Sequence, residues 1–190
     1  MGIKTMIWMA ALAGSMAPAA ERTLTVYVDD RSGAPLAVFS RAQRITGEMF
    51  EAIGVRLKWR FREPGVSDLT EQPIVMTLTR HRPADYQPGA WASAQAFEGV
   101  HLEIMYDRLA QPGSSPNLVS ALLAQVMAHE ITHLLQGINR HSSAGVMKAR
   151  LTDADFVAIQ YKPLSFDPHD VSLIHRGIDM RTSPLKTGGQ

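Results

Sequence analysis

Residues 126–149 of the chain read VMAHEITHLLQGINRHSSAGVMKA. Within this stretch His129 and His133 are four positions apart, so on a helix their side chains project from the same face, about one turn of rise apart. Two neutral imidazoles in that arrangement can bind one zinc ion. Glu130, the residue after His129, is displaced around the helix from the two histidines, so it does not easily bind the same metal with them. It can instead take a proton from a zinc-bound water as that water attacks a carbonyl group. The spacing therefore predicts a metal-dependent hydrolytic site on a helix.

The residues around this stretch place it at the end of a long helix. Ser115 is suited to the N-cap and Pro116 to the first helical position. Gly137 is suited to the left-handed residue that ends a helix. The sequence therefore predicts a helix from about Asn117 to Gln136. Apolar residues flank both histidines, so we expect the helix to be largely buried, where the histidines need polar partners such as a metal.

A catalytic zinc site usually takes three protein ligands and leaves one position for water. His141 lies eight residues after His133, beyond a glycine that lets the chain turn sharply. Asp153 and Asp155 are the alternatives, although Thr152–Asp155 also resembles the capped start of a helix. We favour His141, because the short turn keeps it near the first two ligands and imidazole suits zinc.

Composition limits the other classes of function. The chain has 190 residues, a formal charge of +1 and no cysteine. This length fits one domain, and the near-neutral charge gives no electrostatic reason to expect nucleic acid or an anionic membrane as a partner. Without cysteine the chain cannot form disulfides, use a thiolate nucleophile or bind zinc through sulfur, so a metal site must use histidine and carboxylate ligands.

The first twenty residues have the features of a removable export signal. Lys4 precedes the short apolar run 6–14, and Ala17-Pro18-Ala19 supplies small residues for a signal peptidase. The run is too short to span a bilayer as a permanent helix, although an uncleaved anchor is the alternative. We expect a secreted or periplasmic protein with no stable membrane association after cleavage. The expected divisions are a signal peptide at 1–20, one domain at 21–181 and a disordered tail at 182–190.

Apolar periodicity over the rest of the chain predicts an α+β fold. A period of two indicates strands, and spacings of three and four indicate helices. Strands that precede the main helix favour helices packed on one mixed sheet of about four to five strands. The segment 81–99 is rich in Pro, Gly and Ala, which is typical of a functional rim or of disorder. The expected elements are strands at 24–28, 55–61, 74–79 and 100–107, and helices at 36–53, 117–136 and 166–177.

The strand at 55–61 carries a row of basic residues. Arg56, Lys58, Arg60 and Arg62 alternate with apolar residues. An anion-binding ridge is one interpretation, but charge is balanced elsewhere in the chain, so we favour a solvated outer face of the sheet.

The stretch from His129 to Met147 resembles the zinc signature and Met-turn of metzincin metallopeptidases. Its glycine and third histidine lie four and eight residues after the second histidine, whereas the family generally has three and six. It is closer still to short secreted bacterial proteins that carry H-E-x-x-H-x-x-x-G-x-x-x-H-S-x-x-G-[IV]-M. The resemblance covers most of residues 22–160 in element order and is motif-specific over 126–149.

The resemblance implies a zinc-peptidase fold with one catalytic Zn²⁺. It implies that His129, His133 and His141 bind the metal, that Glu130 is the general base, and that Met147 lies beneath the metal as an apolar floor. The strand at 100–106 is expected to edge the cleft and pair with an extended peptide, and the helix at 166–177 to pack under the site.

One family feature has no counterpart. Astacins and serralysins carry a tyrosine two residues after the methionine of the turn, and here that position is Ala149. By position, Arg150, Leu151 and Phe156 are candidates for the wall of the first substrate pocket. The remaining histidines are expected at the surface, with His101 as a candidate to face the cleft from its strand; they are His81, His101, His169 and His175.

These features predict a secreted zinc-dependent endopeptidase acting on peptide or protein substrates. The first alternative is a zinc-containing module of the same fold that binds a peptide or protein without hydrolysing it. The second is a scaffold with no metal, in which the long helix only packs the core. Turnover of any peptide distinguishes the first two, and metal content distinguishes the third.

Overall fold

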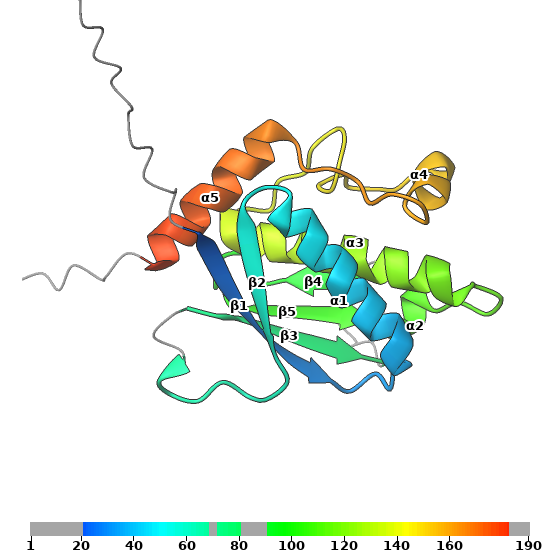
Figure 1. Cartoon of the computed structure of the whole chain (residues 1–190), viewed down its shortest axis with the longest axis horizontal. Helices are drawn as coiled ribbons and strands as arrows, with labels where there is room; N and C mark the ends of the chain where they lie inside the picture. Colours follow the sequence, from blue (N-terminus) through cyan, green and yellow to red (C-terminus); the bar gives the residue numbers. More distant parts are fainter. Residues whose placement is uncertain (1–20, 69–71, 81–90, 183–190) are drawn as a thin grey trace, which may run out of the picture.

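The computed structural model describes residues 21–68, 72–80 and 91–182 (Figure 1). The predicted signal peptide at 1–20, His81 and residues 183–190 of the predicted tail lie outside the described residues. In chain order the elements are β1 (Arg22–Asp30), α1 (Leu36–Glu51), β2 (Val55–Arg60), β3 (Ile74–Thr79), β4 (Ala92–Ala94), β5 (His101–Met105), α2 (Tyr106–Leu109), α3 (Pro116–Gln136), α4 (Asp153–Ala158) and α5 (Pro168–Thr182).

The strands form one mixed sheet in the order β2-β1-β3-β5-β4. The pairs β1–β2, β1–β3 and β3–β5 are parallel, and β4 is antiparallel to β5. Together with the five helices of the described residues, this confirms the predicted α+β class and the sheet of four to five strands. In β2, Arg56, Lys58 and Arg60 are exposed while the residues between them are buried or half-buried, so the basic row faces solvent as favoured.

The edge of the sheet beside the long helix differs from the prediction. The strand expected at 100–107 ends at Met105, and Tyr106–Leu109 forms α2 instead. The expectation that this strand is the edge is wrong, because β5 lies between β3 and β4 and β4 is outermost. β4 has the sequence Ala-Ser-Ala, and three small residues are too short a run for an alternation of apolar and polar residues to indicate a strand.

Two helix ends also differ in detail. The helix predicted at 36–53 ends at Glu51, and the chain turns at Gly54, whose φ is +75°. The closing helix starts at Pro168 as predicted, with Asp167 accepting a hydrogen bond from the His169 backbone N–H at 2.8 Å. It continues to Thr182, beyond the predicted end.

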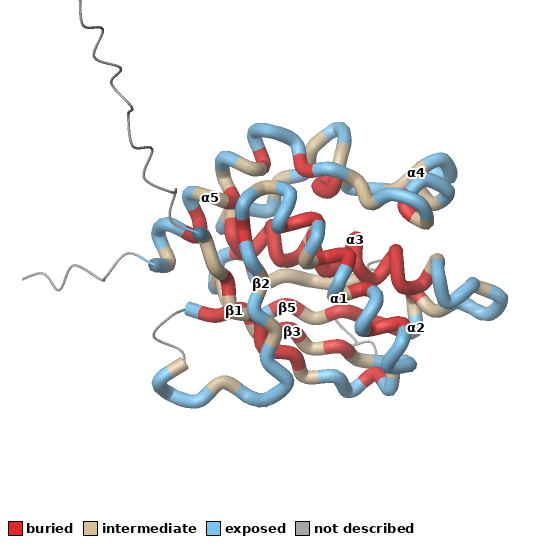
Figure 2. Tube along the Cα trace, in the orientation of Figure 1, coloured by how far each residue is buried: buried red, intermediate tan, exposed pale blue. Residues whose placement is uncertain are grey.

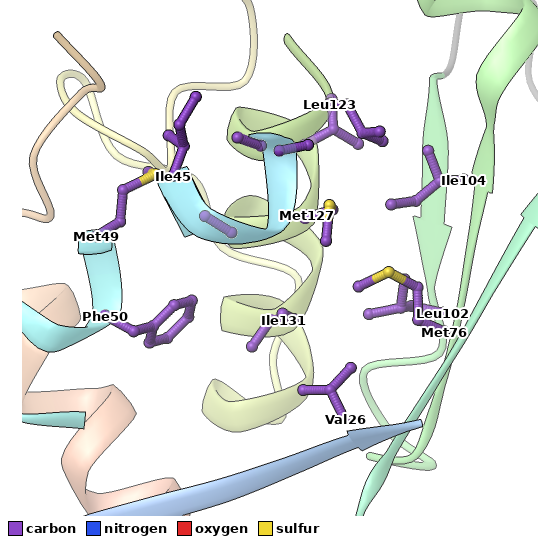
Figure 3. Close-up of a cluster of buried hydrophobic side chains, with 14 of the residues drawn as sticks. Val26, Ile45, Met49, Phe50, Met76, Leu102, Ile104, Leu123, Met127 and Ile131 are labelled. Carbon is purple, nitrogen blue, oxygen red and sulfur yellow. The ribbon is translucent and has the colours of Figure 1, made fainter. Parts of the chain in front are cut away.

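α3 is the centre of the core. Figure 2 shows that it is buried along most of its length, and Figure 3 shows Met127 and Ile131 lying between Phe50 of α1 and Met76 and Leu102 of the sheet. α3 is long and apolar enough to cross a membrane by composition, but 83% of that window is buried inside the protein. It is therefore the core helix of this fold, wrapped by α1, the sheet and α5.

α5 crosses α3 at very short range. Gly177 faces the Leu135 backbone so closely that an added Cβ would lie 1.9 Å from the Leu135 carbonyl oxygen. Glycine therefore permits the two helix backbones to touch near the C-terminal end of α3 (Figure 1). This contact brings the second half of α5 against the end of α3.

Candidate metal centre

Three histidines converge from two parts of the chain. His129 and His133 lie in the last turns of α3, and His141 lies in the loop that follows Gly137, the left-handed helix terminus with φ +65°. The Nε2 atoms of His129 and His133 are 3.0 Å apart. The ring of His141 is centred 5.2 Å from that of His129 and 5.0 Å from that of His133. One ligand nitrogen of each histidine lies within 4.8 Å of the others, a spacing that suits one shared metal ion.

The hydrogen bonds of the Nδ1 atoms determine that the Nε2 atoms of His129 and His133 face the site. Nδ1 of His129 lies 2.9 Å from the Val146 carbonyl oxygen, and Nδ1 of His133 lies 3.3 Å from the Ile138 carbonyl oxygen. A carbonyl can only accept, so each Nδ1 carries the proton and each Nε2 presents a lone pair. Two lone pairs 3.0 Å apart repel each other unless a cation lies between them. The donor set therefore fits a divalent metal that prefers imidazole, such as zinc.

Protonation of these rings is disfavoured. Burial and, to a smaller extent, the neighbouring His129 ring lower the pKa of His133 to about 4. Burial also lowers the pKa of His129, against the hydrogen bond to Val146. Both rings are therefore neutral near pH 7, which is the form that binds a metal.

Glu130 lies on α3, and its buried carboxyl is hydrogen-bonded to the backbone of Ala94 in β4. Burial raises its pKa to about 8, and a hydrogen bond with the Ala94 backbone opposes that shift. A cation held by the histidines would favour the ionised form of this carboxyl by charge attraction. Glu130 is thus placed to hold or release one proton according to whether a metal is bound.

The loop after α3 is fixed by backbone hydrogen bonds. The Ser142 N–H donates to the Met147 carbonyl at 2.7 Å, and the Val146 N–H donates to the Ser165 carbonyl at 3.0 Å. Gly145 has φ +73°, and a Cβ there would lie 2.3 Å from the Ser165 oxygen, so the turn requires glycine. Met147 is fully buried; its place beneath the metal remains an expectation from the family resemblance.

The two alternative ligands, Asp153 and Asp155, both lie in the first turn of α4. Asp155 accepts hydrogen bonds from the backbone and side chain of Thr152 in a capping box and pairs with Lys148. Asp153 is exposed in the first turn of the same helix. The structure therefore brings His141, and neither aspartate, to the other two histidines. Metal binding by His129, His133 and His141 remains a prediction.

The other described histidines lie away from the cluster. His101 is exposed and its Nδ1 lies 2.7 Å from a Glu98 carboxylate oxygen. His175 contacts the Ile53 carbonyl at 2.7 Å, and His169 is exposed on α5. None of the three lines the cleft described next.

The three histidines open onto a cleft of about 1190 Å³. β4 and the residues that follow it line one side, and the segment after Met147 with α4 lines the other. Trp91 and Phe156 meet edge to face across the cleft with their ring centres 5.9 Å apart. Arg150, Leu151 and Phe156, which were predicted by position, all line this cleft.

Sequence reasoning missed Gln125. This residue is buried, and its Nε2 donates at 3.0 Å to the Val146 carbonyl, the same oxygen that accepts from His129. Gln125 lies four residues before His129, on the same helix face, and that spacing is the signal that could have found it. Gln125 supports the carbonyl that orients the first histidine ring.

Comparison with known proteins shows the fold and little else. No protein-family model matches the chain, and no curated protein matches its sequence. In three dimensions the chain is similar to the crystal structure of archaemetzincin from Methanopyrus kandleri, with a TM-score of 0.56 and 18% identity over 86% of this chain and 99% of that one. At that identity the likeness shows a shared fold, which agrees with the predicted metallopeptidase-like architecture. The narrower resemblance to short secreted bacterial proteins remains a prediction.

Proposed function

We propose that this protein is a secreted zinc-dependent endopeptidase in which Glu130 is the general base. The observation that carries the proposal is the pair of Nε2 atoms 3.0 Å apart, each on a ring whose Nδ1 is bonded to a carbonyl. His141 would provide the third ligand, and a zinc ion held by three protein ligands would keep a position open for water. The similarity in fold to archaemetzincin supports the same class of activity.

The chemistry divides between the metal and the chain. Zinc, when bound, supplies a Lewis acid that polarises a carbonyl group and lowers the pKa of water. Glu130 follows His129 in α3 and is buried, so its carboxylate can accept a proton from the attacking water and deliver it to the leaving amine. The hydrogen bond with the Ala94 backbone fixes this carboxyl against β4 while the proton moves.

The substrate is an extended segment of a peptide or protein. β4 is the edge strand of the sheet and lines the cleft, so its outer backbone N–H and C=O groups can pair with an extended chain. This role replaces the one expected for the strand at 100–106. On the opposite side Arg150, Leu151 and Phe156 line the wall against which a substrate side chain packs.

The same proposal includes the division of the chain and its location. A signal peptide at 1–20 directs the protein out of the cytoplasm and is removed, and residues 21–181 form the catalytic domain. The balanced charge favours peptide and protein substrates over nucleic acid or a membrane surface.

The variant Glu130→Gln tests the proposal. It keeps the shape of the side chain and removes the base, so we expect stoichiometric zinc and a loss of peptide hydrolysis of at least about 10²-fold. Zinc content is measured by elemental analysis, and hydrolysis with a peptide library and denatured proteins. Glu48→Gln, at an exposed pair with Arg44 on α1, is the matched control. Undiminished hydrolysis by the Glu130 variant would remove this residue from its role.

The position of Ala149 favours a second candidate function. Astacins and serralysins have a tyrosine at that place, so this chain could bind zinc and a peptide without turning the peptide over. One zinc per chain with no hydrolysis of any peptide would support this binding module. A chain that contains no zinc and is not destabilised by chelators would support the scaffold without metal.

A further inference from the structure

The three histidines of the site are held by different means. The rings of His129 and His133 each donate from Nδ1 to a backbone carbonyl. Within the described residues the ring of His141 has no hydrogen bond of this kind, and the residue is exposed. The orientation of His141 must therefore depend on how its backbone neighbours are held.

Both neighbours of His141 are bonded to one buried carboxylate. Asp170, in the first turn of α5, is 1% exposed. Its Oδ1 accepts from Nη2 of Arg140 at 2.6 Å, and its Oδ2 accepts from Oγ of Ser142 at 2.6 Å. Gln136, the last residue of α3, also donates to Oδ1 at 3.0 Å. One carboxylate thus joins the end of α3, both sides of His141 and α5.

Arg140 closes this network. Its Nη1 donates to Oγ of Ser142 at 3.3 Å and to the His141 carbonyl at 3.4 Å. Hydrogen bonds between ionised groups are shorter and stronger than neutral ones, and a buried carboxylate is costly unless its oxygens are paired. Apolar contacts alone would hold α5 on α3, but they would not fix the direction of the backbone around His141.

We propose that Asp170 is a positioning residue of the metal centre. Through Arg140 and Ser142 it holds the backbone on either side of His141, so the ring is directed at His129 and His133 before a metal binds. The inference rests on the proposed function, because it concerns the same three ligands. Its physical content is pre-organisation: a loop that is already ordered loses less conformational entropy when the metal binds.

Asp170→Asn is the main test, with zinc itself as the probe. The change keeps the size of the side chain and removes the charge that pairs with Arg140. We expect the zinc Kd, measured by competition with a chromophoric chelator, to rise roughly 10- to 100-fold. In the metal-free protein we expect faster hydrogen exchange at the Ser142 N–H, which donates to Met147. Ser142→Ala removes one of the bonds to Asp170 and should raise the Kd less.

Asp179→Asn is the matched control. Asp179 lies on the same helix and forms an exposed pair with Arg22 at 2.8 Å, so we expect the zinc Kd to stay unchanged. Unchanged Kd and exchange in both the Asp170 and Ser142 variants would overturn the inference, as would equal weakening by the Asp179 control. If Asp170→Asn does not fold, Ser142→Ala decides alone. A wild-type chain that binds no zinc would instead refute the proposed function, and exchange in the metal-free variants would still test whether Asp170 orders the loop.

Discussion

The two halves of the metal centre are built on opposite principles. The α3 half is the more local: a buried helix fixes two histidines four residues apart, and the rings of His133 and His129 donate to carbonyls five and seventeen residues later. The loop half is non-local, because His141 depends on Arg140 and Ser142, which are bonded to Asp170 about thirty residues later. The orientation of the metal ligands therefore comes from secondary structure in α3 and from a single side chain, Asp170, in the loop.

The largest expected effect is on zinc affinity, when a histidine is removed from one half or from the other in separate variants. Zinc bound by four ligands has an apparent binding free energy of about 10–16 kcal/mol, which averages about 3 kcal/mol for each ligand, or roughly two orders of magnitude in Kd. We expect His133→Ala to weaken zinc binding by about this amount. His141→Ala should cost less, because the pair that remains is held on one rigid helix. Competition titration of both variants measures the difference, and an equal or larger loss for His141→Ala would mean that the loop is as ordered as the helix.

The glycines of the loop provide a second comparison. Gly137 and Gly145 both have positive φ, but an added Cβ meets nothing within 4 Å at Gly137 and lies 2.3 Å from the Ser165 oxygen at Gly145. We expect Gly137→Ala to lower the free energy of unfolding by about 1 kcal/mol, from backbone strain alone. Gly145→Ala should cost about 2–3 kcal/mol, since the backbone must also move.

Thermal unfolding of the metal-free variants measures these costs, with about 2–4 °C in Tm for each kcal/mol in a chain of this size. Gly113→Ala is the control, because Gly113 has φ +86° and equally open surroundings in a loop before α3. Equal Tm values for the Gly137 and Gly145 variants would show that the contact with Ser165 does not constrain the turn.

The smallest expected effect concerns the pH dependence of Asp155, the half-buried carboxyl in the capping box of α4. The hydrogen bond from Lys148, followed by those from Thr152, lowers the pKa of Asp155 from 3.8 to about 2. A carboxyl whose pKa is lowered on folding stabilises the protein above its unfolded pKa, and that contribution is lost as the pH falls towards 2. We expect Asp155→Asn to lower the free energy of unfolding by at most about 1 kcal/mol at pH 6, and the difference from wild type to shrink as the pH falls towards 2. Tm measured from pH 6 to pH 2 checks this, with Asp153→Asn as control; a difference that grows on acidification would contradict it.

The parts of the molecule that could be predicted are those whose signals lie close together in the chain. Ser115 and Gly137 mark the ends of α3, and the structure has Ser115 accepting from the Leu118 N–H and Gly137 in the left-handed region. Thr152 likewise caps α4. In each case the residues that determine the structure are within one turn of the feature they determine.

The features that escaped prediction depend on distant residues. β4 is a strand because β5 offers it a partner, and its sequence of small residues carries no periodic signal. Asp170 has the sequence context of a first-turn acid in a helix, which favours a simple interaction with the helix dipole. Its bonds to Arg140 and Ser142 arise only when α5 folds back onto α3, so the sequence around Asp170 does not indicate them.

The close crossing of α5 over α3 sets the reach of that carboxylate. Gly177 lies seven residues after Asp170, which is about two turns along the same face of the helix. Because Gly177 has no side chain, α5 packs directly on the backbone of α3. Two turns earlier on α5, Asp170 is hydrogen-bonded to the loop that carries His141. The close approach of the two helices at Gly177 and the hydrogen bonds of Asp170 to the loop of the third histidine thus belong to the same packing of α5 on α3.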